Sequence, residues 1–241
     1  MADPRHAWRR PRAGAWACFG IGLVVLLGLG TWQLERLGWK RNLINTIATR
    51  TTAPPLALGG AVADPAAFDY RRVSATGRFD HGRAIFVSPR FLDGRAGAQM
   101  ITPLLRAGLP PVLVNRGWIP LDRAVPVPRQ GGRTNGRVTV TGIARGIFRR
   151  GLFVPENDPA KGFWITYDPA AMARAMGIGA PLPLVVEADG TAHSGGLPKG
   201  GVTRIDLPNN HLGYALTWYA LAMALVAVFA LAHRPGQGKD R

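Results

Sequence analysis

The sequence predicts a membrane protein of the α+β class, in which two transmembrane helices flank a mainly antiparallel, barrel-like β-domain outside the cytoplasm. Two uncharged stretches, Ala13–Leu34 and Leu212–Ala232, each supply the ~20 residues that an α-helix needs to cross the hydrocarbon core of a bilayer. Between them lies a series of short β-branched and aromatic segments separated by Gly, Pro and Asp, which is typical of strands.

The composition limits the classes of protein to which the chain can belong. Its 241 residues are 47% hydrophobic, which suits one compact domain together with membrane segments. The formal net charge is +16, and such a surface favours anionic lipid headgroups, acidic partners or carboxylate ligands. The basic residues from Arg71 to Arg204 occur singly or in pairs, so we do not expect a nucleic-acid-binding protein. Cys18 is the only cysteine, which excludes an internal disulfide and a thiolate pair for copper or zinc.

The first uncharged stretch follows a basic N-terminus, and two interpretations of it are open. A basic start and an apolar centre are typical of a cleaved signal peptide, and Gly28-Leu29-Gly30 fits a small-x-small cleavage site. The length of the stretch, Trp32 at its end and Arg36 just beyond favour a retained helix. Small residues at spacing four also suit packing against a second helix: Gly14, Cys18 and Gly22.

The segment after the first span continues as an amphipathic helix from Thr31 to Thr49. Pro54 and Pro55 close it. One face gathers aromatic, basic and apolar side chains: Trp32, Arg36, Trp39 and Leu43.

The charge pattern predicts the orientation in the membrane. Basic residues precede the first span and follow the last one: Arg9, Arg10, Arg12, Arg234, Lys239 and Arg241. The positive-inside tendency therefore places both ends in the cytoplasm and the middle in the periplasm. We expect a cytoplasmic N-terminus (1–12), transmembrane helix 1 (13–34), a periplasmic β-rich domain (35–207), transmembrane helix 2 (208–232) and a cytoplasmic C-terminus (233–241). Because a dozen residues leave little room for a transit peptide, we expect the bacterial inner membrane rather than mitochondria.

The middle of the chain predicts seven strands and one helix. The expected strands are Arg71–Phe79, Arg83–Ser88, Gln99–Leu105, Val112–Trp118, Arg137–Arg145, Phe163–Tyr167 and Leu184–Glu187. Helical signal is confined to Pro169–Met176, where Asp168 is the expected N-cap. This pattern indicates a small antiparallel barrel or a strongly curved sheet.

The usual catalytic motifs are missing from the sequence. It has no Gly-x-Ser-x-Gly elbow, no glycine-rich phosphate loop and no His-Glu-x-x-His. His81 and His193 follow turn-like sequences and are expected to be surface histidines. Val114–Pro120 is expected to be a strand end before a turn, with contact of Arg116 and Trp118 with a partner as the alternative. We therefore do not expect an enzyme.

The second span contains the strongest candidate for a binding site. Pro208–Asn210 supply a breaker and caps, so His211 falls in the first turn of the helix, at the membrane surface. Two interpretations remain open: a polar residue wetted by the interface, or a ligand for a planar macrocycle such as haem. Tyr214 and Trp218 are either part of that site or interfacial anchors. A stripe of small residues is expected to face another helix: Gly213, Ala220, Ala224 and Ala227.

Five sequence blocks, in order along the chain, resemble the Surf1 family of cytochrome oxidase assembly proteins. They are Leu29–Gln33 with Arg36, Trp39-Lys40 and Leu43-Ile44; Tyr70–Val73 with Gly77 and Phe79; Val114–Pro120; Asn157–Pro159 with Trp164 and Asp168; and Asn209–Tyr214 with Thr217–Tyr219. The resemblance implies a two-helix inner-membrane protein that binds haem a and assists its insertion into subunit I of a haem-copper oxidase. Its alternative is a scaffold that stabilises an oxidase subunit without binding haem.

The resemblance also implies the site residues and partners. The haem-ligand histidine of the family corresponds to His211, and Trp32, Tyr214 and Trp218 lie in matching motifs. Arg36 and Arg204 lie close to the spans and are expected either to pair with the haem propionates or to act as interfacial anchors. The expected partners are oxidase subunit I, haem a synthase and membrane lipids.

Overall fold

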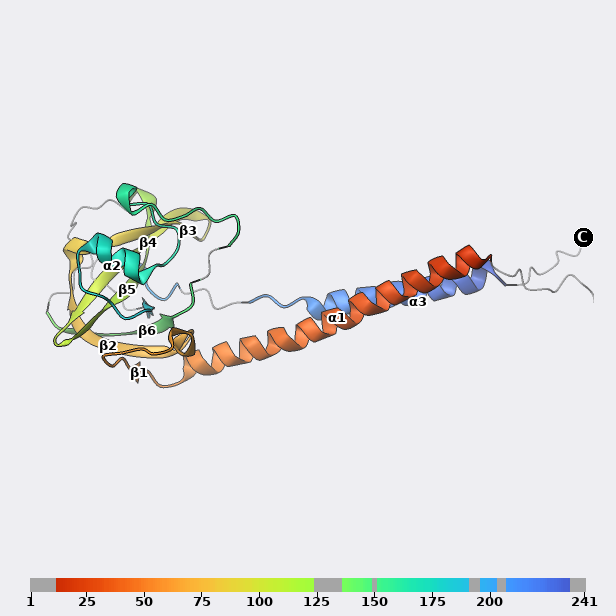
Figure 1. The fold of residues 1–241 in the computed structure, drawn as a ribbon, viewed down its shortest axis with the longest axis horizontal. Helices are drawn as coiled ribbons and strands as arrows, with labels where there is room; N and C mark the ends of the chain where they lie inside the picture. The colour runs from red at the N-terminus through yellow and green to blue at the C-terminus, as the bar shows by residue number, and fades with distance from the viewer. Residues whose placement is uncertain (1–11, 124–135, 149–150, 191–195, 203–206, 235–241) are drawn as a thin grey trace, which may run out of the picture. The chain divides into compact units, whose positions relative to one another are not determined.

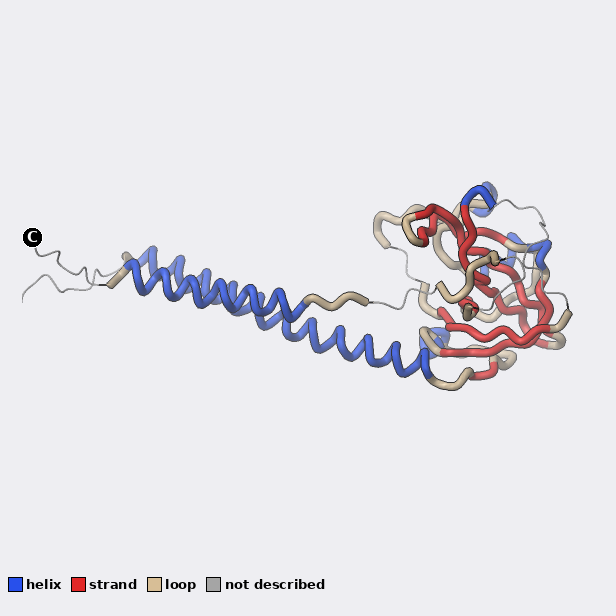
Figure 2. The backbone as a smooth tube through the Cα atoms, turned by 180° about the vertical axis from the view of Figure 1, so that it is seen from behind, coloured by secondary structure: helices blue, strands red, loops and turns tan. Residues whose placement is uncertain are grey.

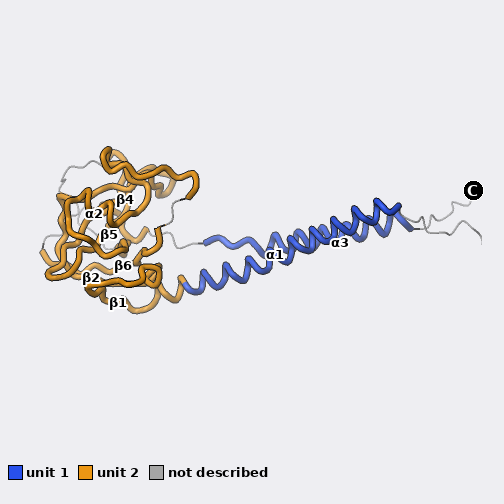
Figure 3. The backbone as a smooth tube through the Cα atoms, in the orientation of Figure 1, with its two compact units in different colours: residues 1–46, 206–241 blue, residues 47–205 orange. Residues whose placement is uncertain are grey.

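The computed structural model describes residues 12–123, 136–148, 151–190, 196–202 and 207–234, and the chain divides into two compact units (Figure 1; Figure 3). We call residues 1–46 and 206–241 the helix pair and residues 47–205 the β-domain. The helices are α1 (Ala13–Thr52), α2 (Pro169–Met176) and α3 (His211–Ala232), and the short 3-10 turns are η2 (Pro65–Phe68), η3 (His81–Arg83), η4 (Leu121–Arg123) and η5 (Pro159–Lys161). The strands are β1 (Leu56–Ala57), β2 (Arg72–Phe79), β3 (Ile85–Leu92), β4 (Arg95–Arg106), β5 (Leu109–Pro120), β6 (Val138–Arg145) and β7 (Val185–Ala188).

Helices α1 and α3 contain the two uncharged stretches, and both are long and apolar enough to cross a bilayer. Helix α1 runs without a break through the first stretch and the amphipathic segment after it, which confirms the predicted continuation. It ends at Thr52, just before Pro54 and Pro55. Proline lacks an amide hydrogen and disfavours the helical conformation in the residue before it, so the helix cannot extend further.

Within the helix pair, α1 and α3 run antiparallel and side by side (Figure 2). The contacts that join them include Phe19 with Phe229, Gly22 with Leu225, Gly30 with Tyr219, and Gln33 with His211. Phe19 and Gln33 are two heptads apart, and Ala215 and Ala222, which are both buried, are one heptad apart. This spacing is the period of coiled-coil packing, in which a narrow seam of one helix faces the other.

The predicted small-residue faces of both helices are largely wrong. Gly213, Ala220, Ala224 and Ala227 are exposed, as are Gly14 and Cys18 on the first helix. Among the expected glycines, a Cβ would meet the other helix only at Gly22, where it would approach Leu225 at 3.2 Å. The expectation failed because it grouped residues by size, whereas the seven-residue seam selects them by position.

The β-domain is a mostly antiparallel sheet that closes into a five-strand barrel, as predicted. The strand order is β1-β2-β6-β7-β5-β4-β3, and a further pairing of β2 with β4 closes the ring β2-β6-β7-β5-β4. All neighbours are antiparallel except β1 with β2 and β5 with β7, which are parallel. Figure 2 shows the strands, in red, curving around one another.

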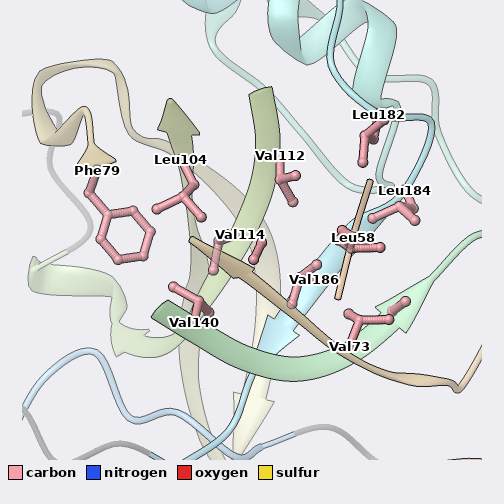
Figure 4. Packing of buried hydrophobic residues seen from close by; sticks show 12 residues of the cluster. Leu58, Val73, Phe79, Leu104, Val112, Val114, Val140, Leu182, Leu184 and Val186 are labelled. Carbon is pink, nitrogen blue, oxygen red and sulfur yellow. The ribbon is translucent and has the colours of Figure 1, made fainter. Parts of the chain in front are cut away.

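Two hydrophobic clusters lie on opposite faces of the sheet. Successive side chains of a strand point to opposite faces, so Val114 and Val186 enter the barrel cluster while Leu113 and Val185 enter an outer cluster. Figure 4 shows barrel residues from different strands pointing toward one another. The outer cluster is completed by Trp164 and by two methionines of α2. Burial on both faces explains why these strands are continuously apolar.

The strand predictions are confirmed except in one segment. Six of the seven expected segments overlap β2 to β7, and α2 has the predicted bounds and cap, since Asp168 Oδ1 accepts a hydrogen bond from Ala171 N at 2.9 Å. Phe163–Tyr167 is not a strand; it makes only single bridges, such as Val87 with Trp164. Its aromatic residues predict a strand, but the Trp164 side chain packs into the outer cluster and is 1% exposed.

Candidate functional site

His211 is the first residue of α3, and its side chain faces α1. Its Nδ1 lies 2.7 Å from Gln33 Oε1. An amide oxygen can only accept a hydrogen bond, so this contact requires the hydrogen of a neutral imidazole to be on Nδ1. Nε2 then carries the free lone pair that can bind a metal.

Gln33 has the position of a residue that orients a metal ligand. Histidines that bind metals usually donate their other ring N–H to an oxygen, which fixes the tautomer and the ring orientation. Gln33 and His211 are both half-buried, so the contact is partly shielded from water.

Two turns further along α3, Tyr219 packs against α1. A Cβ at Gly30 would lie 2.8 Å from the Tyr219 ring, so only glycine fits there without displacing the ring. Thr31 Oγ1 donates to the carbonyl of Leu27 at 3.0 Å, and its distance to the Tyr219 hydroxyl is 3.1 Å. Since the threonine hydrogen is already used, Tyr219 donates to Thr31.

An apolar groove begins at Tyr219. Its volume is about 510 Å³, and it lies among side chains of both helices: Leu23, Leu27, Tyr219, Ala222, Met223, Val226 and Ala227. Tyr219 is eight residues from His211, or about 12 Å along the helix at 1.5 Å per residue. The close contact of Gly30 with Tyr219 leaves no space for a ligand between the two helices at that level.

The other predicted site residues that the structure describes are exposed or half-buried. Trp32 and Tyr214 are 54% and 57% exposed, and Trp218 is half-buried. Arg36 is exposed, with its guanidinium carbon 3.9 Å from the centre of the Trp39 ring. Arg204 lies outside the described residues.

Gln33 and Tyr219 were missed as site residues by the sequence reasoning. A signal for Gln33 was present, because Phe19, Leu26 and Gln33 repeat every seven residues along the first helix. Tyr219 had no such signal, because its role depends on the register between two helices far apart in the sequence.

The β-domain contains a second group of polar side chains, centred on Tyr167. Its hydroxyl accepts from Asn115 Nδ2 at 2.8 Å and lies 3.0 Å from both Gln99 Oε1 and Glu187 Oε1. Burial, together with the charge of Glu187 and its hydrogen bond, raises the pKa of Tyr167 well above its ordinary value. The phenol therefore stays protonated and holds three strands together.

Arg145 extends this group to the edge of the barrel. It lies 3.2 Å from Asp69 Oδ1 and 3.9 Å from Glu187 Oε1. Burial alone would lower the pKa of Arg145, but the charges of Glu187, Tyr70 and Asp69 outweigh it and raise the pKa. These paired groups stabilise the fold.

Arg116 and Trp118 are structural residues. They are only 2% and 7% exposed, so neither presents a surface for a partner in this conformation. Arg116 lies over the Phe79 ring, and its Nη1 is 3.1 Å from Nδ1 of His81, which was predicted to be a surface histidine and is half-buried. Burial lowers the pKa of Arg116 to about 10. His193 lies outside the described residues.

The sequence of the chain is similar to that of known proteins over most of its length. Residues 21–223 match the SURF1 family. Surfeit locus protein 1 of Mus musculus is 37% identical over 212 residues, which cover 82% of this chain and 68% of the mouse protein. The Homo sapiens protein of the same name is 36% identical over 253 residues, covering 92% of this chain and 83% of its own, and that of Xenopus tropicalis is 35% identical over 217 residues, covering 83% and 70%. The match spans both helices and the barrel between them, and the chain therefore belongs to the SURF1 family.

Proposed function

We propose that this chain binds haem a at His211 and assists its insertion into subunit I of a haem-copper terminal oxidase, cytochrome c oxidase. Membership of the SURF1 family supports a role in oxidase assembly. The observation that supports the haem proposal is the 2.7 Å contact of His211 Nδ1 with Gln33, because a hydrogen on Nδ1 leaves the lone pair of Nε2 to bind the haem iron.

The surroundings of His211 fit a haem that is cargo rather than a permanent cofactor. The iron of a haem already has four porphyrin nitrogens, so a single imidazole is enough to hold it. The groove of about 510 Å³ suits the apolar tail of haem a. One ligand at an exposed helix end gives weaker binding than an enclosed pocket, which favours transfer to the oxidase.

Charged and aromatic residues near the helix start complete the proposed site. Arg36 is exposed and can pair with a propionate in a charge-assisted hydrogen bond. Trp32, Tyr214 and Trp218 supply ring surfaces for the macrocycle. Arg204 remains a predicted propionate partner.

The proposed location is the bacterial inner membrane, with the β-domain in the periplasm. It is supported by two helices able to cross a bilayer and by basic residues beyond both of them. There the chain would meet oxidase subunit I, haem a synthase and lipids. A reporter active only in the periplasm tests this when it is inserted in the exposed β4–β5 turn; a silent reporter with the β-domain folded overturns the orientation.

The haem proposal is tested by replacing His211 with alanine and measuring haem a that co-purifies from cells that synthesise it. His233→Ala is a matched control, since His233 ends the same helix and its Nδ1 donates to the Phe229 carbonyl at 2.8 Å. We expect His211→Ala to lose its haem absorbance and His233→Ala to keep it. Unchanged haem content in His211→Ala removes the ligand assignment. Haem-free wild-type protein that still co-purifies with subunit I identifies a scaffold instead.

A further inference from the structure

The segment between β6 and η5 exposes two large apolar side chains at its tip. Leu152 and Phe153 are each 98% exposed, more than any other large apolar residue that the structure describes. They are the two central residues of a turn in which Val154 N–H donates to the Gly151 carbonyl at 3.1 Å. Adjacent apolar side chains that touch almost nothing in a folded domain indicate an interaction site.

Both arms of this tip are fixed to the β-domain. On one side, the Phe148 ring packs edge-on against Tyr167, with ring centres 5.7 Å apart. On the other side, Asn157 Oδ1 accepts from Ile165 N at 2.9 Å and Thr166 N at 3.1 Å. The two apolar side chains are therefore held out by a turn between anchored arms.

The tip is too small for a stable protein interface but large enough for a lipid contact. A stable protein interface covers about 800 Å² per partner, whereas even an aromatic side chain contributes only roughly 150–250 Å². A leucine beside a phenylalanine is also the combination that inserts into the boundary between headgroups and acyl chains.

The covalent structure tethers the β-domain at both ends to helices that are able to cross a bilayer. At one end it continues into α1, and at the other only eight residues separate Val202 from His211 at the start of α3. A chain of that length spans at most about 30 Å at roughly 3.5 Å per residue.

We propose that Leu152 and Phe153 insert into the interfacial layer of the bilayer and anchor the β-domain at a third point, in addition to its two covalent ends. The net charge of +16 favours a membrane that contains anionic phospholipids. This inference requires α1 and α3 to cross a bilayer, but it does not depend on haem binding.

The test uses the full chain in nanodiscs of phosphatidylcholine and phosphatidylglycerol. Cys18→Ser removes the only cysteine, and Phe153→Cys then accepts a fluorophore that responds to its environment. Ala107→Cys is the matched control, because Ala107 is exposed in the turn between β4 and β5. We expect a spin-labelled phospholipid to quench the probe at 153 severalfold more than the probe at 107, and aqueous iodide to do the reverse.

Two results overturn the proposal. Equal quenching of both probes by iodide, without quenching by lipid, shows a tip in water; protection of the probe at 153 from both quenchers shows a protein contact. A second variant, Leu152→Asp in the same labelled chain, is expected to lower lipid quenching at 153 to the control level. Unchanged quenching in that variant contradicts insertion through apolar side chains, and its folding is not in question because Leu152 makes almost no contacts.

Discussion

The helix pair and the β-domain use their shielded polar groups in opposite ways. In the β-domain, Tyr167 is surrounded by Asn115, Gln99 and Glu187, and Arg145 lies between two carboxylates. These donors and acceptors largely satisfy one another. In the helix pair, His211 uses Nδ1 for Gln33, and among the described residues no hydrogen bond to its Nε2 is seen.

The two regions differ because one set of polar groups stabilises the fold and the other is able to bind a ligand. A buried network whose members are paired with each other stabilises and specifies a fold, but it has little capacity left for a ligand. A histidine with one nitrogen held and one free is arranged to receive something from outside. Under the proposed function, the barrel is a scaffold and the start of α3 holds the haem.

The largest expected effect is on the unfolding free energy of the β-domain. Trp164→Ala removes a side chain that is 1% exposed in the outer cluster and should cost about 3–5 kcal/mol of unfolding free energy, because the cavity cannot collapse fully. Phe163→Ala is the neighbouring control, since Phe163 is 39% exposed; it should cost less than about 1 kcal/mol. Urea unfolding of the full chain, followed by far-ultraviolet circular dichroism, measures both. Equal losses would mean that Trp164 does not support the barrel.

Two glutamines provide the sharpest test of the comparison. Gln33→Leu should weaken haem binding about 10–100-fold, the usual cost of losing a residue that orients a metal ligand, and leave the stability of the β-domain unchanged. Gln99→Leu should do the opposite, because Gln99 accepts from both Tyr167 and Arg90 in the β-domain. Haem titration and urea unfolding give the haem affinity and the unfolding free energy of each variant. If Gln33→Leu lowers only stability, its contact with His211 is structural.

The fold could be predicted further than the site. Uncharged length identified α1 and α3, and runs of β-branched residues identified six strands, because both signals are local. The strand predicted at Phe163–Tyr167 failed because packing of Trp164 into the outer cluster, which no local pattern reveals, replaced the pairing of a sheet. β1 was missed because two residues carry no pattern.

Of the proposed site, the sequence predicts one residue, His211, from its position at the end of an apolar run and from the family resemblance; its role as a ligand stays a prediction. Its partner was not predicted, because the contact with Gln33 depends on the register of two helices that are separated by most of the chain. The same register decides that Gly30 must be glycine opposite Tyr219. Residues whose contacts depend on this register can be identified only when the pairing of the two antiparallel helices is known.

A smaller effect is expected from the pH dependence of the β-domain. The raised pKa of Tyr167 means that above pH ~10, the ordinary pKa of tyrosine, the unfolded chain loses this proton while the folded chain keeps it. The contribution of Tyr167 to stability is therefore complete below pH ~10 and declines as the pH rises. Tyr167→Phe should be less stable by about 1–3 kcal/mol at neutral pH and show a shallower decline above pH ~10. Urea unfolding from neutral to alkaline pH tests this, with the exposed Tyr214→Phe as control; parallel curves for Tyr167→Phe and wild type would contradict it.

The smallest expected effect lies in the helix pair. Tyr219→Phe removes the hydrogen bond to Thr31 but keeps the ring against Gly30, so it should weaken the packing of α1 with α3 by about 0.6 kcal/mol, the average for such bonds between membrane helices. Gly30→Leu is the contrasting variant, since its side chain must displace the ring and with it the register that brings Gln33 to His211. Titration with sodium dodecyl sulfate measures helix separation, and haem absorbance measures the site. We expect Tyr219→Phe to retain haem and Gly30→Leu to lose it. Equal haem content in both variants would mean that haem binding at His211 does not depend on the register of the two helices.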